Sequence, residues 1–237
     1  MICWIIFVSI GAILLFFFLF YRVQEKRLVA LFYKGLTSLM FVLTAIVTWQ
    51  TSNGFNNFFG LFVVFGLIFG LLGDIFLDLK YIIIKKEDFY TVLGFAAFGI
   101  GHIFFSCGLL IFFYNYNQTI FYILIPLFIS IFFSFVSLLL QKFTPIRYKN
   151  MKPCVVIYGF LLFFVTTLFF AVAIQSEFRY VTIVIMAPSF VAFTLSDLIL
   201  NNTYFAPNCN TPIYVISNHV LYYFAQFAIA ISLYFLI

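Results

Sequence analysis

Apolar side chains fill this sequence in long, nearly uninterrupted runs. Eight of these runs reach the length of about 20 residues that an α-helix needs to cross the hydrocarbon core of a membrane. They cover residues 3–21, 28–49, 57–79, 90–114, 119–140, 153–174, 180–201 and 213–236. The connections are too short to fold by themselves. The pattern therefore predicts an all-α membrane protein, a single bundle of eight transmembrane helices, with residues 1–237 forming one domain.

Composition narrows the class of protein further. Hydrophobic residues make up 66% of the chain and charged residues 8%, whereas a soluble domain keeps about a quarter of its residues charged. This excludes a soluble enzyme, a disordered chain and a nucleic-acid-binding domain. The four cysteines (Cys3, Cys107, Cys154 and Cys209) form no CxxC pair and lack metal-ligand spacing. The sequence thus predicts neither a metal site nor a cofactor.

Positive charge is distributed unevenly over the connections. Ten basic residues lie on the first, third and fifth connections: Arg22, Lys26, Arg27, Lys80, Lys85, Lys86, Lys142, Arg147, Lys149 and Lys152. The other side has only Arg179, and Lys34 lies inside a span. By the positive-inside rule the basic connections are cytoplasmic, so both termini should be extracytoplasmic. The first run has no positive charge before it, which argues against a cleavable signal peptide.

Six ionisable residues lie inside the predicted spans: Lys34, Asp74, Asp78, His102, Asp197 and His219. Such residues are costly in a membrane and indicate a functional site. The helix rise places Lys34, Asp74, Asp197 and His219 about 5–10 Å below the cytoplasmic boundary, and His102 roughly 15–18 Å below it. Tyr158 and Tyr223 fall in the same inner half. The sequence therefore predicts one polar site near the cytoplasmic leaflet.

Three of these residues also have simpler interpretations. Lys34 could extend its ammonium to the interface, and His219 could be a hydrogen-bonded group that packs helices together. Asp78 lies one turn beyond Asp74 and nearer the boundary, so we expect it to be a solvated helix end close to Lys80. On that interpretation Asp78→Asn should keep most of the activity and change the folding yield little.

Asp74 and Asp197 are each embedded in apolar sequence. Two carboxyl groups in an apolar, partly wet pocket tend to differ in protonation, because burial and mutual repulsion favour a neutral form for one of them. The neutral group can act as a general acid while the ionised one acts as a base or stabilises a cation. Lys34 could determine which of the two carboxyl groups is ionised, by pairing with that one. Glycoside hydrolysis uses such a pair of carboxyl groups. The sequence contains neither the GxSxG motif of serine hydrolases nor the HExxH motif of zinc proteases.

Several short motifs occur together in a characteristic order. They are Leu72-Gly73-Asp74, Gly101-His102, Pro153 with Tyr158, Ser196-Asp197-Leu198 and Tyr223-Phe224-Ala225-Gln226. With eight spans, this combination resembles the YhhN-type membrane proteins, which include the lysoplasmalogenases. The sequence departs from the family pattern at Gly35, where the lysine is usually followed by proline, and at Phe105, where tyrosine is usual.

The resemblance implies a hydrolase that cleaves the vinyl ether bond of lysoplasmalogens, giving a fatty aldehyde and glycerophosphocholine or glycerophosphoethanolamine. It implies Asp74 and Asp197 as catalytic residues. Supporting or substrate-binding roles would go to Lys34, His102, Tyr158, Ser196, Tyr223 and Gln226. The partner would be a membrane lysophospholipid. Tyr158, Tyr222 and Tyr223 could line the cytoplasmic mouth and hold the head-group cation on their rings, or could simply pack with hydroxyl partners.

Two other classes compete with this interpretation. A non-enzymatic carrier of lipid or small solute could use the Asp, Lys and His groups as a proton relay, although the sequence lacks the repeat symmetry of many transporters. A metal-dependent lipid hydrolase of the ceramidase type would need more histidine ligands than the two present. Activity of the purified protein on a lysoplasmalogen, with and without chelator, distinguishes the three.

Overall fold

The computed structural model describes residues 3–54, 58–113 and 120–237, and within them the chain is all-helical. Each of the long helices is long and apolar enough to cross a membrane, which makes the chain a multi-pass membrane protein. They are α1 (Cys3–Val23), α2 (Arg27–Thr51), α3 (Phe58–Ile82), α4 (Glu87–Phe113), α5 (Phe121–Phe143), α6 (Lys152–Gln175), α7 (Val181–Phe205) and α8 (Pro212–Ser232). Short 3₁₀ turns lie at η1 (Ile84–Lys86), η2 (Lys149–Met151) and η3 (Leu233–Phe235).

The eight predicted spans coincide with the eight long helices, and only the ends differ. Helix α4 begins at Glu87, whereas the predicted span begins at residue 90. Helix α8 ends at Ser232 and is followed by η3, whereas the predicted span continues to residue 236. Residues 57, 114 and 119, at the predicted ends of three spans, lie outside the described residues. Apolar length thus predicts the helices well, because crossing a membrane sets that length.

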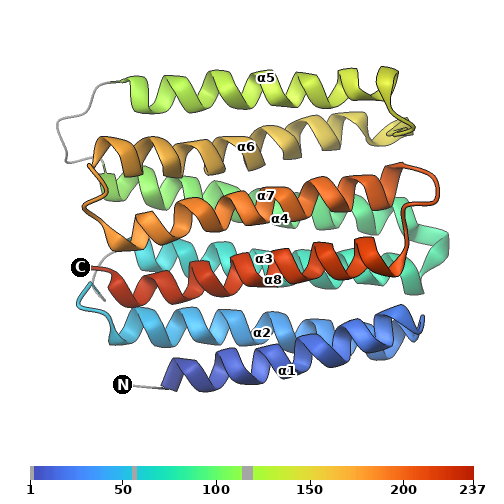
Figure 1. The fold of residues 1–237 in the computed structure, drawn as a ribbon, viewed down its shortest axis with the longest axis horizontal. Helices are drawn as coiled ribbons and strands as arrows, with labels where there is room; N and C mark the ends of the chain where they lie inside the picture. Colours follow the sequence, from blue (N-terminus) through green and yellow to red (C-terminus); the bar gives the residue numbers. More distant parts are fainter. Residues whose placement is uncertain (1–2, 55–57, 114–119) are drawn as a thin grey trace.

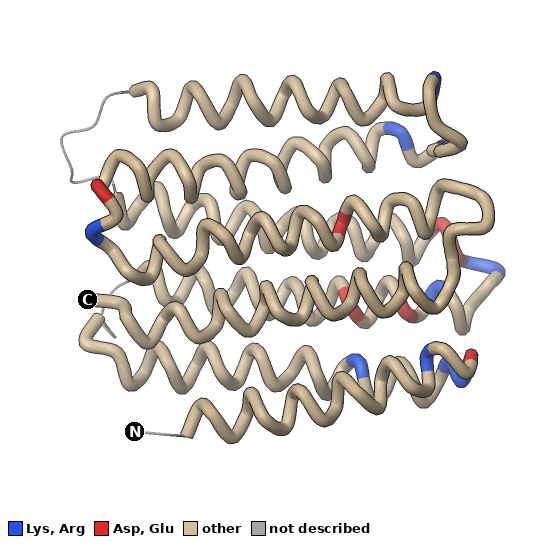
Figure 2. The backbone as a smooth tube through the Cα atoms, viewed as in Figure 1, with Lys and Arg blue, Asp and Glu red and all other residues tan. Residues whose placement is uncertain are grey.

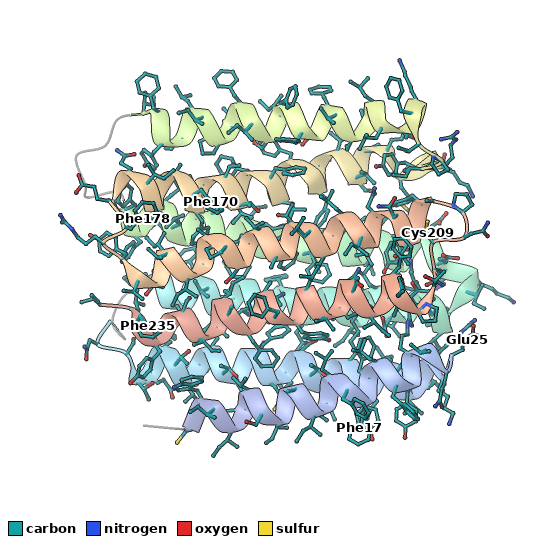
Figure 3. All side chains as sticks on the ribbon, in the orientation of Figure 1. Phe17, Glu25, Phe170, Phe178, Cys209 and Phe235 are labelled. Atoms are coloured by element: carbon teal, nitrogen blue, oxygen red, sulfur yellow. The ribbon has the colours of Figure 1, made fainter. Side chains whose placement is uncertain are left out.

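The helices run antiparallel, and they pack as the hairpins α1–α2, α3–α4, α5–α6 and α7–α8 (Figure 1). The pair α1–α2 forms one edge of the bundle and α5–α6 the other, while α3, α4, α7 and α8 lie between them. The outermost helices α1 and α5 bury few side chains, and Phe128 of α5 is 67% exposed. Phe17, labelled on α1 in Figure 3, is also partly exposed, although its ring stacks on Tyr33 of α2. Such apolar outer faces suit a lipid environment.

Basic residues gather at one end of the bundle, opposite the C-terminus (Figure 2). One of them differs from the sequence prediction, which placed Lys80 in a loop. Lys80 lies in the last turn of α3, only 5% exposed, with its ammonium 2.9 Å from the ring centroid of Tyr204. A cation over an aromatic face is stabilised electrostatically. Lys80 therefore contributes to packing at the basic end rather than to a solvated loop.

The distribution of basic residues predicts a membrane orientation. We expect the basic end of the bundle to face the cytoplasm and the C-terminus the opposite side, because Lys and Arg are retained on the cytoplasmic side during insertion. A reporter active only outside the cytoplasm, fused after Ile237, should be active. The same reporter inserted near Lys85 should be silent. A cytoplasmic signal at Ile237 would contradict the expected orientation.

Candidate functional site

Lys34 joins two carboxylates near the basic end of the bundle. Its ammonium lies 3.1 Å from Asp78 Oδ1 and 3.3 Å from Asp74 Oδ1. Asp74 and Asp78 are four residues apart and so occupy one face of α3, which packs against α2. Lys34 is 4% exposed. The ammonium therefore does not extend to the interface, which was the simpler interpretation of this residue.

Asp74 accepts hydrogen bonds from two further side chains. The Ser38 hydroxyl donates to Asp74 Oδ2 at 2.6 Å, and the Tyr222 hydroxyl donates to the same oxygen at 2.8 Å. Ser38 follows Lys34 by one turn on α2, so both reach Asp74 from the same helix face. A carboxyl that faces an ammonium and accepts two hydroxyl hydrogen bonds is best stabilised in its ionised form.

Asp78 is buried, and the prediction of a solvated helix end was wrong. It is 3% exposed, and besides Lys34 it has Arg22 as a partner, with Arg22 Nη1 3.7 Å from Asp78 Oδ2. The last turn of α1 brings Arg22 over this face of α3, which continues to Ile82 beyond Asp78. Lys34, Arg22, Asp74 and Asp78 thus form a buried cluster of two cations and two carboxylates.

Burial reverses the expected effect of changing Asp78. We now expect Asp78→Asn to destabilise the protein by about 3 kcal/mol, because breaking a buried ion pair leaves a positive charge without compensation. Thermal unfolding in detergent measures this loss. Asp88→Asn is the matched control, since Asp88 is exposed at the start of α4. Equal melting temperatures of the Asp78 and Asp88 variants would contradict the buried cluster.

A second polar cluster surrounds Asp197 on the other side of the bundle's centre. The Tyr158 hydroxyl of α6 donates to Asp197 Oδ2 and lies 3.4 Å from His102 Nε2 of α4. The buried Ser196 hydroxyl bonds the carbonyl of Phe193 and also reaches Asp197. Asp197 is half-buried. Within the described part of the chain no cation lies at ion-pair distance from it.

Three aromatic rings separate the two clusters. The Tyr222 ring lies edge-on to Phe193 and Phe98, with centroid separations of 5.4 and 5.9 Å. Phe193 also faces the His102 ring at 5.1 Å. Asp74 and Asp197 have separate hydrogen-bond partners. The predicted layer of polar residues is therefore two neighbouring clusters with an aromatic partition between them.

The remaining candidates support these clusters from within. The Tyr223 hydroxyl bonds Ser38 at 3.0 Å, and Gln226 Nε2 donates to the Tyr222 hydroxyl at 2.9 Å. Tyr222 and Tyr223 are 4% and 0% exposed. They therefore do not line an open mouth, as one alternative had it, but pack with hydroxyl partners. His219 Nδ1 bonds the carbonyl of Val215 on its own helix at 2.7 Å, and its ring lies edge-on to Phe18 of α1 at 4.8 Å, which fits a helix-packing group.

An apolar groove leads from the outer surface to the second cluster. It has a volume of about 300 Å³ and lies between α4 and α6, lined by Val92, Phe95, Ala96, Gly99, Ile100, Ile103, Cys154, Ile157, Tyr158 and Leu161. Tyr158 is the member that also bonds Asp197. A single hydrocarbon chain in this groove would thus end beside the Asp197 carboxyl.

Comparison with models of known protein families gives a match that includes most of these site residues. The sequence model of the YhhN family matches residues 45–233, most of the chain. The chain belongs to the YhhN family. This family includes lysoplasmalogenases, and the resemblance seen in the sequence motifs is confirmed. Searches of curated proteins and of solved structures found no match.

The YhhN match covers only part of the site. Asp74, His102, Tyr158 and Asp197 lie inside the matched residues, whereas Lys34 and its neighbours in the first part of α2 precede them. Sequence reasoning missed Arg22 and Ser38. Ser38 could have been found from its position one turn after Lys34, but nothing in the sequence pairs Arg22 with Asp78. Among the described residues, no group of three His, Cys, Asp or Glu side chains is arranged to hold a metal ion.

Proposed function

We propose that this YhhN protein is an ether hydrolase of the lysoplasmalogenase type. It would cleave the vinyl ether bond of a lysoplasmalogen to a fatty aldehyde and glycerophosphocholine or glycerophosphoethanolamine. The observation that carries the proposal is the contrast between two carboxyl groups. Asp74 faces the Lys34 ammonium, whereas Asp197 has hydroxyl partners. Asp74 is therefore the ionised group and Asp197 the one that holds a proton.

Vinyl ether hydrolysis needs such a pair. Asp197 donates its proton to the enol-ether carbon remote from oxygen, which leaves an oxocarbenium ion. The negative charge of Asp74 and the rings of Phe193 and Tyr222 stabilise this cation. Water adds to the cationic carbon and loses a proton to Asp197. The resulting hemiacetal breaks its bond to the glycerol oxygen, which takes up a proton, so one water is consumed and Asp197 is regenerated.

His102 is placed to hold the attacking water. Its Nε2 faces the Tyr158 hydroxyl, while its Nδ1 is buried and has no hydrogen-bond partner among the described residues. A buried polar atom normally has a partner, and a water molecule would supply it. Tyr158 then links His102 to Asp197, so the water and the proton donor lie on one side of the substrate. The groove between α4 and α6 would hold the hydrocarbon chain.

The test is cleavage of a lysoplasmalogen by the detergent-purified protein in D₂O. We expect release of a fatty aldehyde that carries deuterium on the carbon next to the carbonyl, since that carbon receives the proton. The saturated alkyl ether analogue should stay intact, and chelator should have no effect. Failure to release aldehyde would refute the proposal and favour the carrier. Inhibition by chelator that zinc reverses would favour a metallohydrolase.

A further inference from the structure

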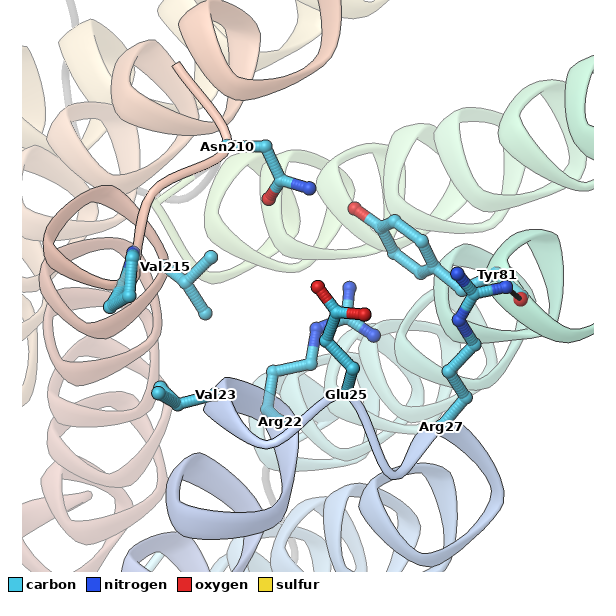
Figure 4. Close-up of a pocket in the computed structure, with 8 residues that line it drawn as sticks. Arg22, Val23, Glu25, Arg27, Tyr81, Asn210 and Val215 are labelled. Carbon is cyan, nitrogen blue, oxygen red and sulfur yellow. Dashed lines mark hydrogen bonds between the residues drawn. The ribbon is translucent and has the colours of Figure 1, made fainter. Parts of the chain in front are cut away.

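A small polar cavity opens at the basic end, where α1 turns into α2. Its volume is about 130 Å³, and it is lined by Arg22, Val23, Glu25, Arg27, Tyr81, Asn210, Pro212 and Val215 (Figure 4). The walls come from the α1–α2 turn, the end of α3, and the loop before α8 with that helix's first turn. Segments far apart in the sequence therefore meet around one polar space.

Arg22 forms the floor of this cavity and its link to the carboxylate cluster. The guanidinium lies 3.7 Å from the Tyr81 ring centroid, and one of its nitrogens lies 3.7 Å from Asp78 Oδ2. Only 10% of the side chain is exposed. The Arg22 guanidinium has five N–H donors, and Asp78 lies on only one side of it. Arg22 thus presents donors toward the cavity from a position fixed by stacking and an ion pair.

The rim carries one charge of each sign. Arg27 Nη1 donates to the backbone carbonyl of Tyr81 at 2.8 Å, which holds its guanidinium at the rim. Figure 4 shows the Glu25 carboxylate extending from the α1–α2 turn toward the Tyr81 ring and the Asn210 amide. Among the described residues neither Glu25 nor Arg27 forms an ion pair. Both charges are therefore available to a ligand.

We propose that this cavity binds the zwitterionic head group of a single-chain phospholipid. Guanidinium groups bind phosphate oxygens through paired hydrogen bonds, so the phosphate would lie between Arg22 and Arg27. The ammonium would lie against Glu25. Arg22 and Arg27 place positive charge in the lining, and Glu25 places a negative charge at a separate point on the rim. Separated charges of both signs suit a zwitterion better than a free phosphate dianion.

The position of the cavity agrees with the proposed function, on which this inference rests. Asp74 lies one turn beyond Asp78, about 6 Å farther along α3 from the cavity. In a lysoplasmalogen the phosphorus and the vinyl ether oxygen are separated by five bonds, roughly 6 Å when extended. The α3 residue that lines the cavity is Tyr81, seven residues or about 10 Å along the helix from Asp74. A phosphate held by Arg22 would therefore place the vinyl ether oxygen between the cavity and Asp74.

The test measures binding of a saturated 1-O-alkyl lysophosphoethanolamine, which the protein cannot cleave. Arg27→Gln should weaken its binding about tenfold, the usual scale for losing a hydrogen bond to a charged group. Lys26→Gln removes the same charge from the same turn but lies outside the cavity, and should leave the affinity unchanged. Equal affinities of these two variants would overturn the proposal.

Selectivity provides a readout that local unfolding would not produce. Glu25→Gln should weaken the ethanolamine lipid about tenfold and leave the matching lysophosphatidic acid bound as tightly as before. Glycerophosphoethanolamine should compete better than inorganic phosphate. Equal competition would mean a free-phosphate site and would overturn the head-group assignment. Because the analogue is not cleaved, these outcomes are independent of whether the enzyme activity is found.

Discussion

Replacing either Asp74 or Asp197 with asparagine is expected to lower the rate of vinyl ether cleavage by about 10²–10⁴-fold. Asparagine keeps the shape of the side chain, but it cannot donate the proton that Asp197 supplies or carry the negative charge of Asp74. The double variant should be little slower than the slower single variant, because groups that act as a unit are not additive. Aldehyde release by the purified variants measures these rates.

The control separates chemistry from folding. Asp88→Asn should retain wild-type turnover, and each variant should elute in detergent as the wild type does. Near-normal turnover in Asp74→Asn or Asp197→Asn would contradict the carboxyl-pair mechanism. Tyr158→Phe offers a milder test, since it removes the hydroxyl that bonds Asp197 without removing the carboxyl.

Lys34→Met is expected to have the largest effect on stability. The ammonium is the shared partner of Asp74 and Asp78, at 3.3 and 3.1 Å. Its removal leaves a buried negative charge that Arg22 alone does not balance. Loss of one partner from a buried ion pair costs about 3–5 kcal/mol, which thermal unfolding in detergent would show as a large fall in melting temperature.

A second change tests whether charge is the cause. The double variant Lys34→Met with Asp78→Asn restores neutrality to the cluster, so it should be more stable than Lys34→Met alone. Lys26→Met, at an exposed position, should melt as the wild type does. If the double variant were less stable than both single variants, packing of the lysine stem rather than charge balance would explain the loss.

The sequence was enough to predict the helices, because lipid requires long apolar segments whatever they pack against. It also predicted that Lys34, Asp74 and Asp197 share a depth, since helix rise converts position into depth. Asp78 was judged from its own helix alone. Its burial depends on Arg22, which reaches it from α1, and no local pattern records which helices are neighbours.

The proposed difference in role between Asp74 and Asp197 could not have come from the sequence. The sequence places Asp74 and Asp197 at the same estimated depth and so does not distinguish them. They differ in their partners, which are the Lys34 ammonium for Asp74 and the Tyr158 hydroxyl for Asp197. Lys34 reaches Asp74 but not Asp197, because α2 packs on α3 whereas α7 faces α6 and α8. The aromatic partition of Phe98, Phe193 and Tyr222 depends on three helices meeting, which composition rich in phenylalanine could not locate.

The charge cluster also constrains how the protein is made. Helix α2 carries Lys34 and emerges from the ribosome before α3, which carries both carboxylates. Each helix alone would place uncompensated charge in lipid, which costs about 2.5–3.5 kcal/mol per group at the membrane centre and less at the shallower depth of this cluster. Insertion of α2 and α3 together, as a hairpin, lets the charges neutralise one another before either helix is released. We therefore expect α2 to be released into lipid only after α3 has been synthesised.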